Sequence, residues 1–220
     1  MIEQTETRES ITGVRKLIAA NLVKSHTEIP AVNIIEECDL TGVDRAMLVP
    51  MVLASIGEVV RSFPVFNAAV IDGEIVRYSR CDIGIAVDTE RGLMVPAVRD
   101  CGSREVEALA DDVVSLAAKA REGKLSPLDM RAATTTFTSP GKRGGIIATP
   151  IINAPQTAIV GLHRMVDKPV VRDNQIVIRT IANLTLTFDH RVADGALAGD
   201  YLLTLARTLE AHALKYQASR

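Results

Sequence analysis

Residues 183–195 carry the sequence Asn-Leu-Thr-Leu-Thr-Phe-Asp-His-Arg-Val-Ala-Asp-Gly (NLTLTFDHRVADG), which predicts the end of the last strand and the start of the helix that follows it. The alternation in residues 183–188 predicts a strand that ends at Asp189-His190-Arg191. A closing helix is predicted from about Gly195 to Leu214, because apolar side chains recur there at helical spacing. A strand that ends at an imidazole and turns into a helix presents that ring at the edge of the sheet, where ligands collect.

Three further helices are predicted upstream. The first starts after Ser10 or Thr12, places Val14, Leu17, Ile18 and Leu22 at helical spacing, and ends before Ile29-Pro30. The second has Pro50 in its first turn and runs to Phe63. The third, residues 104–122, is strongly amphipathic and is capped by Gly123.

Short strands with turn signals fill the rest of the chain. They are predicted at 31–40, 66–71, 74–78, 82–88, 93–98, 134–138, 146–152, 157–162, 168–172 and 176–188. Asp72-Gly73 and Asp173-Asn174 are hairpin turns by their chemistry. Since helices and hairpins interleave irregularly, we expect an α/β fold in which a mixed sheet is layered with helices, a two-layer sandwich. Residues 11–220 form one domain after a flexible leader, residues 1–10.

Composition excludes several classes of protein. The chain has 220 residues with 25 basic and 27 acidic side chains, so it has no basic field for binding nucleic acid. No apolar stretch approaches the roughly 18 residues of a membrane helix, and the polar N-terminus is unlike a signal peptide. Cys38, Cys81 and Cys101 lack the spacing of a disulfide framework or a zinc site, and a reducing compartment such as the cytoplasm is favoured.

Two segments contain residues that could take part in catalysis, and each also has a purely structural interpretation. His190 is a candidate base or a buried, hydrogen-bonded histidine, and Asp194 can cap the helix that follows. The second segment, residues 134–145, has threonines followed by Pro-Gly, Lys142-Arg143 and Gly-Gly. It is either a strand and turn with solvated basic residues, or a hydroxyl aimed at a reaction centre. His26, His163 and His212 are taken as surface or packing histidines.

The whole pattern resembles one family. DHRVADG (189–195) is similar to the DHRxxDG signature of dihydrolipoamide acyltransferases, the core components of 2-oxo acid dehydrogenase complexes. The other matching segments, in family order, are GVRKLIAANLVKSHTEIP (13–30), FPVFNA (63–68), DIGIAVDTERGLMVPAVRD (82–100), GKLSPLDMRAATTTFTS (123–139) and GGIIATPIINAPQTAIVGLHRM (144–165). The resemblance implies a chloramphenicol-acetyltransferase-like fold. It also implies transfer of an acyl group between the thiols of dihydrolipoamide and coenzyme A.

The resemblance assigns roles by position. His190 is the general base, because attack on a thioester needs a thiolate and ordinary thiols are mostly protonated at neutral pH. Thr138, 52 residues earlier, stabilises the oxyanion, with the adjacent Ser139 as the alternative. Asp194 supports the structure around His190, and Arg15 is its hypothetical partner. The weaker candidates for contacting coenzyme A are Arg15, Ser139, Lys142 and Arg143; no metal site is expected.

The family also implies partners. They are a homotrimer in which His190 of one chain meets Thr138 of its neighbour, a larger cubic or dodecahedral core, the decarboxylase and dihydrolipoamide dehydrogenase components, and a lipoyl domain. No lipoyl or subunit-binding domain is recognised in this chain, so a separate domain or protein would present the lipoyl group. The expected location is the cytoplasm, or the mitochondrial matrix in a eukaryote.

Departures from the family pattern keep two alternatives open. Ala31 stands where many members have histidine after Ile-Pro, and Pro140 and Lys142-Arg143 replace more usual residues after the hydroxyl segment. One alternative is a chloramphenicol-acetyltransferase-like enzyme that acylates a hydroxyl. The other is a non-catalytic scaffold component of the complex. The sequence does not indicate which acyl group is carried, since one methylene changes binding by only about 1–3 kcal/mol.

Overall fold

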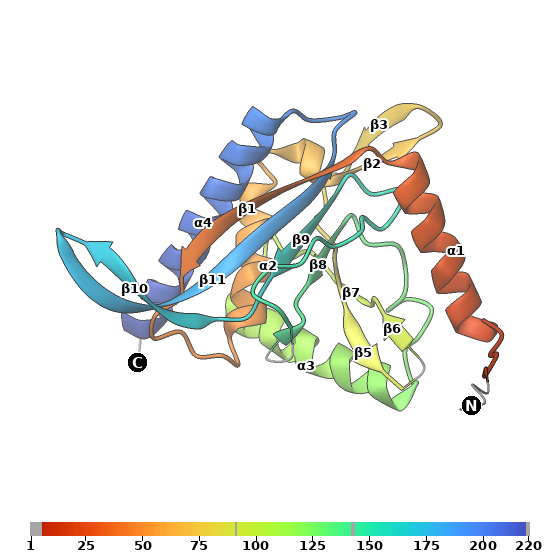
Figure 1. The fold of residues 1–220 in the computed structure, drawn as a ribbon, viewed down its shortest axis with the longest axis horizontal. Helices are drawn as coiled ribbons and strands as arrows, with labels where there is room; N and C mark the ends of the chain where they lie inside the picture. The colour runs from red at the N-terminus through yellow and green to blue at the C-terminus, as the bar shows by residue number, and fades with distance from the viewer. Residues whose placement is uncertain (1–5, 91, 142–143, 219–220) are drawn as a thin grey trace, which may run out of the picture.

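A seven-stranded mixed sheet forms the centre of the protein (Figure 1). The computed structural model describes residues 6–90, 92–141 and 144–218. In sheet order the strands are β1 (Ala31–Asp39), β11 (Gln175–Asp189), β9 (Ala158–Leu162), β8 (Thr135–Thr138), β4 (Ile83–Ile85) and β7 (Ala97–Val98), and β10 (Val166–Arg172) pairs with the first half of β11. β8 is parallel to β9 and β4, and every other pair in this sheet is antiparallel. The predicted mixed sheet is therefore confirmed.

Three helices cover one face of this sheet. They are α2 (Leu48–Val59), α3 (Val106–Glu122) and α4 (Gly195–Ala218). α4 packs on β1 and β11, and α2 lies between α4 and α3. The buried side chains Leu184, Leu186 and Phe188 of β11 meet the apolar stripe of α4, which includes Leu202 and Leu205. This arrangement of a helical layer on a mixed sheet confirms the predicted two-layer sandwich.

Local turn chemistry explains several element boundaries. Asp72 and Gly73 both have positive φ and join β2 (Ala68–Ile71) to β3 (Glu74–Arg77), as the Asp-Gly pair predicts. Asp173 and Asn174 do the same between β10 and β11. Gly123 ends α3 in the left-handed conformation, with φ of 69°. A second small pair, β5 (Val87–Thr89) with β6 (Gly92–Met94), lies beside α3.

The strand predicted at residues 146–152 is wrong. This segment has no ladder partner, although it is rich in isoleucine. Pro150 lacks a backbone N–H, and the carbonyls of Ile146 and Ile152 accept hydrogen bonds from the side chains of Asn183 and Ser25. Side-chain donors therefore take the place of a neighbouring strand.

α2 ends earlier than predicted, and α1 begins after the second of its two predicted caps. α2 ends at Val59 and does not reach Phe63, since Pro64 disfavours helical geometry at the residue before it and begins a short 3-10 turn, η1 (Pro64–Phe66). α1 (Gly13–Glu28) begins after Thr12, which occupies the N-cap position without a side-chain hydrogen bond, so Ser10 is not the cap. Of the predicted leader, residues 6–10 have no regular structure and residues 1–5 lie outside the described residues.

Several surfaces of the described chain expose apolar side chains, and two of them lie on opposite sides of the molecule. α1 runs along one side of the molecule, away from the three packed helices (Figure 1), and exposes Val14, Leu17, Leu22 and Val23. The hairpin of β10 and β11 projects from the opposite side and exposes Val171, Ile176 and Ile178. None of the described helices combines the length and apolar character needed to cross a membrane.

Candidate active site

His190 lies at the end of β11, where the sheet passes into α4. Its backbone N–H donates to the carbonyl of Pro30 at 3.1 Å, and its ring lies 5.6 Å from the ring of Phe188. Phe188 belongs to the buried core, whereas the His190 side chain is exposed. The imidazole is therefore carried on a rigid base and faces solvent in the single chain. The histidine is not buried, so the packing alternative for this residue is wrong.

Asp189 and Arg191 anchor the backbone on either side of that histidine. The Asp189 carboxylate is fully buried and accepts hydrogen bonds from Nε and Nη2 of Arg191, at 2.6–3.1 Å. The backbone N–H of Arg191 also donates to it, at 3.0 Å. The motif gave this pair no predicted role of its own, although opposite charges that flank a histidine are visible in the sequence.

Asp194 caps α4. Its Oδ1 accepts a hydrogen bond from the backbone N–H of Leu197 at 2.9 Å, and its carbonyl accepts from Ala198 at 3.1 Å. This confirms the structural role predicted for the residue. No ion pair joins Asp194 to Arg15 within the described chain, because α4 begins on the opposite side of the molecule from the first turn of α1 (Figure 1).

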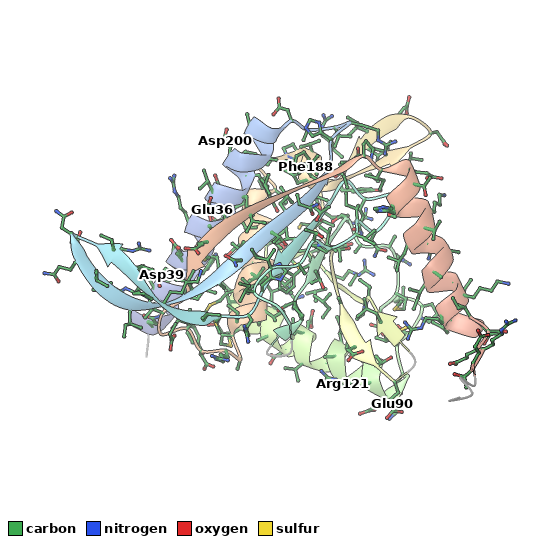
Figure 2. The ribbon with its side chains drawn as sticks, in the orientation of Figure 1. Glu36, Asp39, Glu90, Arg121, Phe188 and Asp200 are labelled. Carbon is green, nitrogen blue, oxygen red and sulfur yellow. The ribbon has the colours of Figure 1, made fainter. Side chains whose placement is uncertain are left out.

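Thr138 is the last residue of β8 and lies far from His190. In the sheet register Thr138 pairs with Gly161 on β9, and Gly161 pairs with Thr185 on β11. His190 is five residues beyond Thr185, which is about 17 Å along the strand at 3.3 Å per residue, and two strands to the side. Figure 2 labels Phe188 and Asp39, which lie near opposite ends of the β1–β11 pair. A single chain therefore cannot bring the two groups onto one substrate.

The side chain of Thr138 is half-buried, and its hydroxyl makes no hydrogen bond within the described residues. It lies on the face of the sheet opposite the helices, since its neighbour Phe137 packs in the helix-covered core. We call this the second face of the sheet. The adjacent residue Ser139 follows the strand, and its Oγ accepts a hydrogen bond from the N–H of Gly141 at 3.3 Å. The hydroxyl of Thr138 is thus free to donate to a ligand.

A cavity of about 460 Å³ lies next to Ser139, between the end of β8 and α3. Asp88, Arg121 and Gly141 also line it. Arg121 is a basic residue at this cavity that sequence analysis did not single out. Of the other weak candidates, Arg15 lies on α1 and does not line this cavity, and Lys142 and Arg143 lie outside the described residues.

The described chain offers neither a metal site nor a reactive thiol of its own. No group of three potential metal-binding side chains occurs in the part of the chain that the structure describes. Cys38, Cys81 and Cys101 are free and buried, and burial raises the pKa of each thiol, that of Cys101 to about 12. The groups suited to chemistry are therefore an exposed imidazole and a free hydroxyl.

Known proteins are similar to this chain in sequence and in fold. Residues 3–215 match the family described as 2-oxoacid dehydrogenases acyltransferase (catalytic domain). A relative from Bacillus subtilis, the dihydrolipoyllysine-residue acetyltransferase component of its pyruvate dehydrogenase complex, is 38% identical over 94% of this chain. The chain spans about half of that relative, 51% of its length.

Solved structures agree with this result. The dihydrolipoamide acetyltransferase of Azotobacter vinelandii, studied for the role of a serine, a histidine and an asparagine in its catalytic mechanism, has a TM-score of 0.88 and 30% identity, over 94% of this chain and 92% of that one. The cubic core of a pyruvate dehydrogenase multienzyme complex has a TM-score of 0.88 and 31% identity, over 95% and 93%. A chloramphenicol acetyltransferase, at 15% identity and a TM-score of 0.52 over 93% and 99%, shares the fold alone.

Proposed function

Because this chain belongs to the catalytic-domain family of 2-oxo acid dehydrogenase acyltransferases, we propose that it transfers an acyl group between the thiols of dihydrolipoamide and coenzyme A. The observation that carries the proposal is a match of spacing. Thr138, His190 and Asp194 are separated by 52 and 4 residues, as are the serine, histidine and asparagine of the Azotobacter vinelandii enzyme. Threonine keeps the hydroxyl of serine, and aspartate, like asparagine, can cap a helix.

His190 acts as the general base in this proposal. It removes the proton from the attacking thiol, and the thiolate forms a bond to the thioester carbonyl carbon. The carbonyl π electrons move to the oxygen, which becomes an oxyanion that accepts a hydrogen bond from Thr138. When the oxyanion collapses, the bond to the second sulfur breaks, and His190 returns the proton to that sulfur. Both thiols start and end protonated, so the reaction is reversible without a metal or a redox step.

A second copy of the chain is required to build this site. His190 and Thr138 lie at different ends of one sheet, as the register between β8, β9 and β11 indicates. A neighbouring copy of the chain can supply Thr138 to the His190 of the first copy at a subunit contact. A ring of three copies then contains three identical sites. The exposed apolar residues of α1 and of the β10–β11 hairpin support association, since water-exposed apolar surfaces of this kind mark interfaces. We therefore propose a homotrimer, able to assemble into a larger core such as the cubic core of its structural relative.

The cavity beside Ser139 is a candidate place for part of coenzyme A. Arg121 offers a cation and Ser139 a hydroxyl, a donor set that suits a phosphate or an amide oxygen. Asp88 also lines the cavity, and its negative charge would disfavour a phosphate nearby. The amide portion of coenzyme A would therefore lie on the Asp88 side of the cavity. The lipoyl group, the decarboxylase and the dihydrolipoamide dehydrogenase are proposed partners supplied by other domains or proteins. Acetyl is the acyl group to test first, because the relatives are named as acetyltransferases.

Subunit complementation tests both the reaction and the shared site. His190→Ala and Thr138→Val are each expected to be nearly inactive with acetyl-CoA and dihydrolipoamide. If the two variants are co-assembled in equal amounts, about one quarter of the sites will combine an intact His190 with an intact Thr138, and activity will return accordingly. Co-assembly of His190→Ala with the double variant is the matched control, because no site then holds both groups.

The outcomes separate the alternatives. A parent enzyme that acetylates chloramphenicol but not dihydrolipoamide would support an O-acyltransferase, and a parent without any turnover would support a scaffold. If the parent is active and mixed assemblies form without recovery of activity, the two groups do not meet across a subunit contact, and the shared site is wrong.

A further inference from the structure

The aromatic side chains of this protein are few, and most of them gather in one place. The chain has four phenylalanines, three tyrosines and no tryptophan. Four of these seven rings contact one another in the helix-covered core and form what we call the aromatic cluster: Phe63, Phe66, Phe188 and Tyr201. The ring of Phe188 also contacts the imidazole of His190. The aromatic cluster therefore ends at the candidate base.

The other rings of the cluster hold Phe188 in place. Phe188 is fully buried, and its ring meets that of Phe66 edge to face, with centroids 6.2 Å apart and an interplanar angle of 87°. Phe66 of η1 is also fully buried and packs on Tyr201 of α4, at 4.6 Å and 39°. Tilted and edge-to-face contacts at about 4.5–7 Å are the favoured geometries of aromatic pairs. Because protein interiors are close-packed, a ring enclosed in this way keeps one rotamer.

The imidazole of His190 leans on this fixed ring. The centroids of the two rings are 5.6 Å apart, and their planes are inclined by 32°, closer to parallel than to perpendicular. His190 follows Phe188 by two residues, the repeat of a strand, so both side chains project to the same side. The imidazole makes no hydrogen bond within the described residues, so no polar partner there sets its direction. The contact with Phe188 is what restrains it.

A general base needs a defined direction. Proton transfer requires the ring nitrogen to lie within about 2.6–3.2 Å of the atom that gives up the proton. An exposed side chain without a partner changes rotamer within picoseconds to nanoseconds, and most rotamers carry the nitrogen away from the thiol. A rigid ring beside the imidazole favours the rotamer that stacks on it and occupies the space of others.

We infer that Phe188 is a positioning residue for His190: its buried ring supports one face of the imidazole and keeps the base directed at the thiol. This inference rests on the proposed acyl transfer. Phe188 acts here through His190 and not by contact with a substrate. Its effect therefore belongs to the chemical step, because an imidazole in the wrong rotamer leaves substrate binding intact but cannot take the proton.

Steady-state kinetics with acetyl-CoA and dihydrolipoamide test the inference. Phe188→Leu keeps an apolar side chain in the core but removes the ring. We expect kcat to fall about tenfold with both KM values unchanged, since a small misplacement of a catalytic group can cost up to about 100-fold. Phe188→Tyr keeps the ring and should keep most of the rate.

Phe63→Leu is the matched control. Phe63 belongs to the same aromatic cluster and undergoes the same chemical change, but its ring contacts Tyr201, at 5.7 Å, and not His190. Its kcat should stay close to that of the parent. Urea denaturation of both variants measures how much core packing each substitution removes. A loss of kcat in Phe188→Leu alone, in protein that is folded at the assay temperature, distinguishes positioning from support of the core.

A double-mutant cycle tests whether Phe188 acts through His190. When Phe188→Leu is added to His190→Ala, the residual kcat should not fall further, because no imidazole is left to orient. Should Phe188→Leu fail to fold, Phe188→Met probes the same contact, since methionine fills irregular space in a core without supplying a ring. Its kcat is also expected to fall about tenfold.

Each result has a defined meaning. A parent without acyl transfer would overturn the proposed function and this inference together. An active parent in which Phe188→Leu matches Phe63→Leu in kcat would overturn the inference alone. The same holds if Phe188→Leu lowers the residual kcat of His190→Ala by its full factor, or if its effect lies in KM and not in kcat.

Discussion

The buried carboxylate of Asp189 is held by the guanidinium of Arg191, two residues later and on the other side of His190. Nη2 of Arg191 lies 2.6 Å from Oδ2 of Asp189, and Nε lies 2.9 Å from Oδ1. Asp189 is fully buried, whereas the side chain of Arg191 is 44% exposed. The Asp189 carboxylate is therefore buried and forms its ion pair with an arginine at the surface. This ion pair fixes the backbone that carries the His190 imidazole.

Arg191→Ala should lower the free energy of unfolding by about 3 kcal/mol, because it leaves a buried carboxylate without its partner. This value is at the low end for broken buried pairs, since solvent can reach the site. Arg172→Ala is the control, because Arg172 forms an exposed pair with Asp39 at 3.6 Å and should change stability by less than about 1 kcal/mol. Urea denaturation of both variants measures the difference. Equal effects would mean that solvent already screens Asp189.

His190→Ala should lower kcat by about 100- to 10,000-fold, the usual contribution of a general base. The imidazole is exposed and its one ring contact is with Phe188, so the unfolding temperature should stay close to that of the parent. His212→Ala provides the control, since His212 lies on α4 beside Glu58 at 3.4 Å, remote from the end of β11. A fully active His190→Ala protein would show that His190 is not the general base.

Thr138→Val should lower kcat by about 100- to 1,000-fold, the value of one oxyanion donor. Thr138→Ser retains the hydroxyl and should retain most of the rate. Ser139→Ala should change the KM for coenzyme A and leave kcat nearly unchanged, because Ser139 lines the candidate coenzyme A cavity and adjacent residues at the end of β8 face opposite sides. If Ser139→Ala were the inactive variant and Thr138→Val the active one, the assignment of the hydroxyl would move by one residue.

Substitutions of Asp194 separate capping from chemistry. Asp194→Ala removes the acceptor for the Leu197 N–H and should lower the free energy of unfolding by about 1 kcal/mol. Asp194→Asn keeps an acceptor oxygen, so stability should be nearly unchanged. Thermal unfolding and turnover are measured on the same samples. A stable Asp194→Asn protein with a large loss of kcat would assign a chemical role to the charge.

The buried imidazole of His163 makes stability depend on pH. Burial lowers the pKa of His163 in the folded protein, whereas the unfolded chain takes up a proton near the ordinary value of about 6.5. Stability is therefore complete above about pH 6.5 and falls as the pH drops below it, toward the lowered pKa of the folded state. His163→Gln should flatten the pH dependence of unfolding between pH 7 and 5, and the exposed His26→Gln should not. An unchanged slope in His163→Gln would show that burial does not lower the pKa of His163 in the folded protein.

Short-range signals in the sequence predicted most of the fold. Helices α3 and α4 follow from apolar spacing, and the hairpin turns at Asp72-Gly73 and Asp173-Asn174 follow from backbone preferences of those residue types. The strand predicted at residues 146–152 failed because it required a partner strand. Asn183 and Ser25, both far away in the sequence, supply the hydrogen bonds instead. No local pattern contains that information.

The amino-acid sequence alone indicated the family and predicted Thr138, His190 and Asp194 as site residues, since a motif depends only on residue type and spacing. Tertiary structure decided where these residues lie. Strand register places Thr138 two strands to the side of β11, and His190 lies five residues beyond the point on β11 that faces Thr138 across β9. The physical reason is that hydrogen-bonded pairing joins strands that are distant along the chain, so the neighbours of a side chain across the sheet depend on register and not on its own segment.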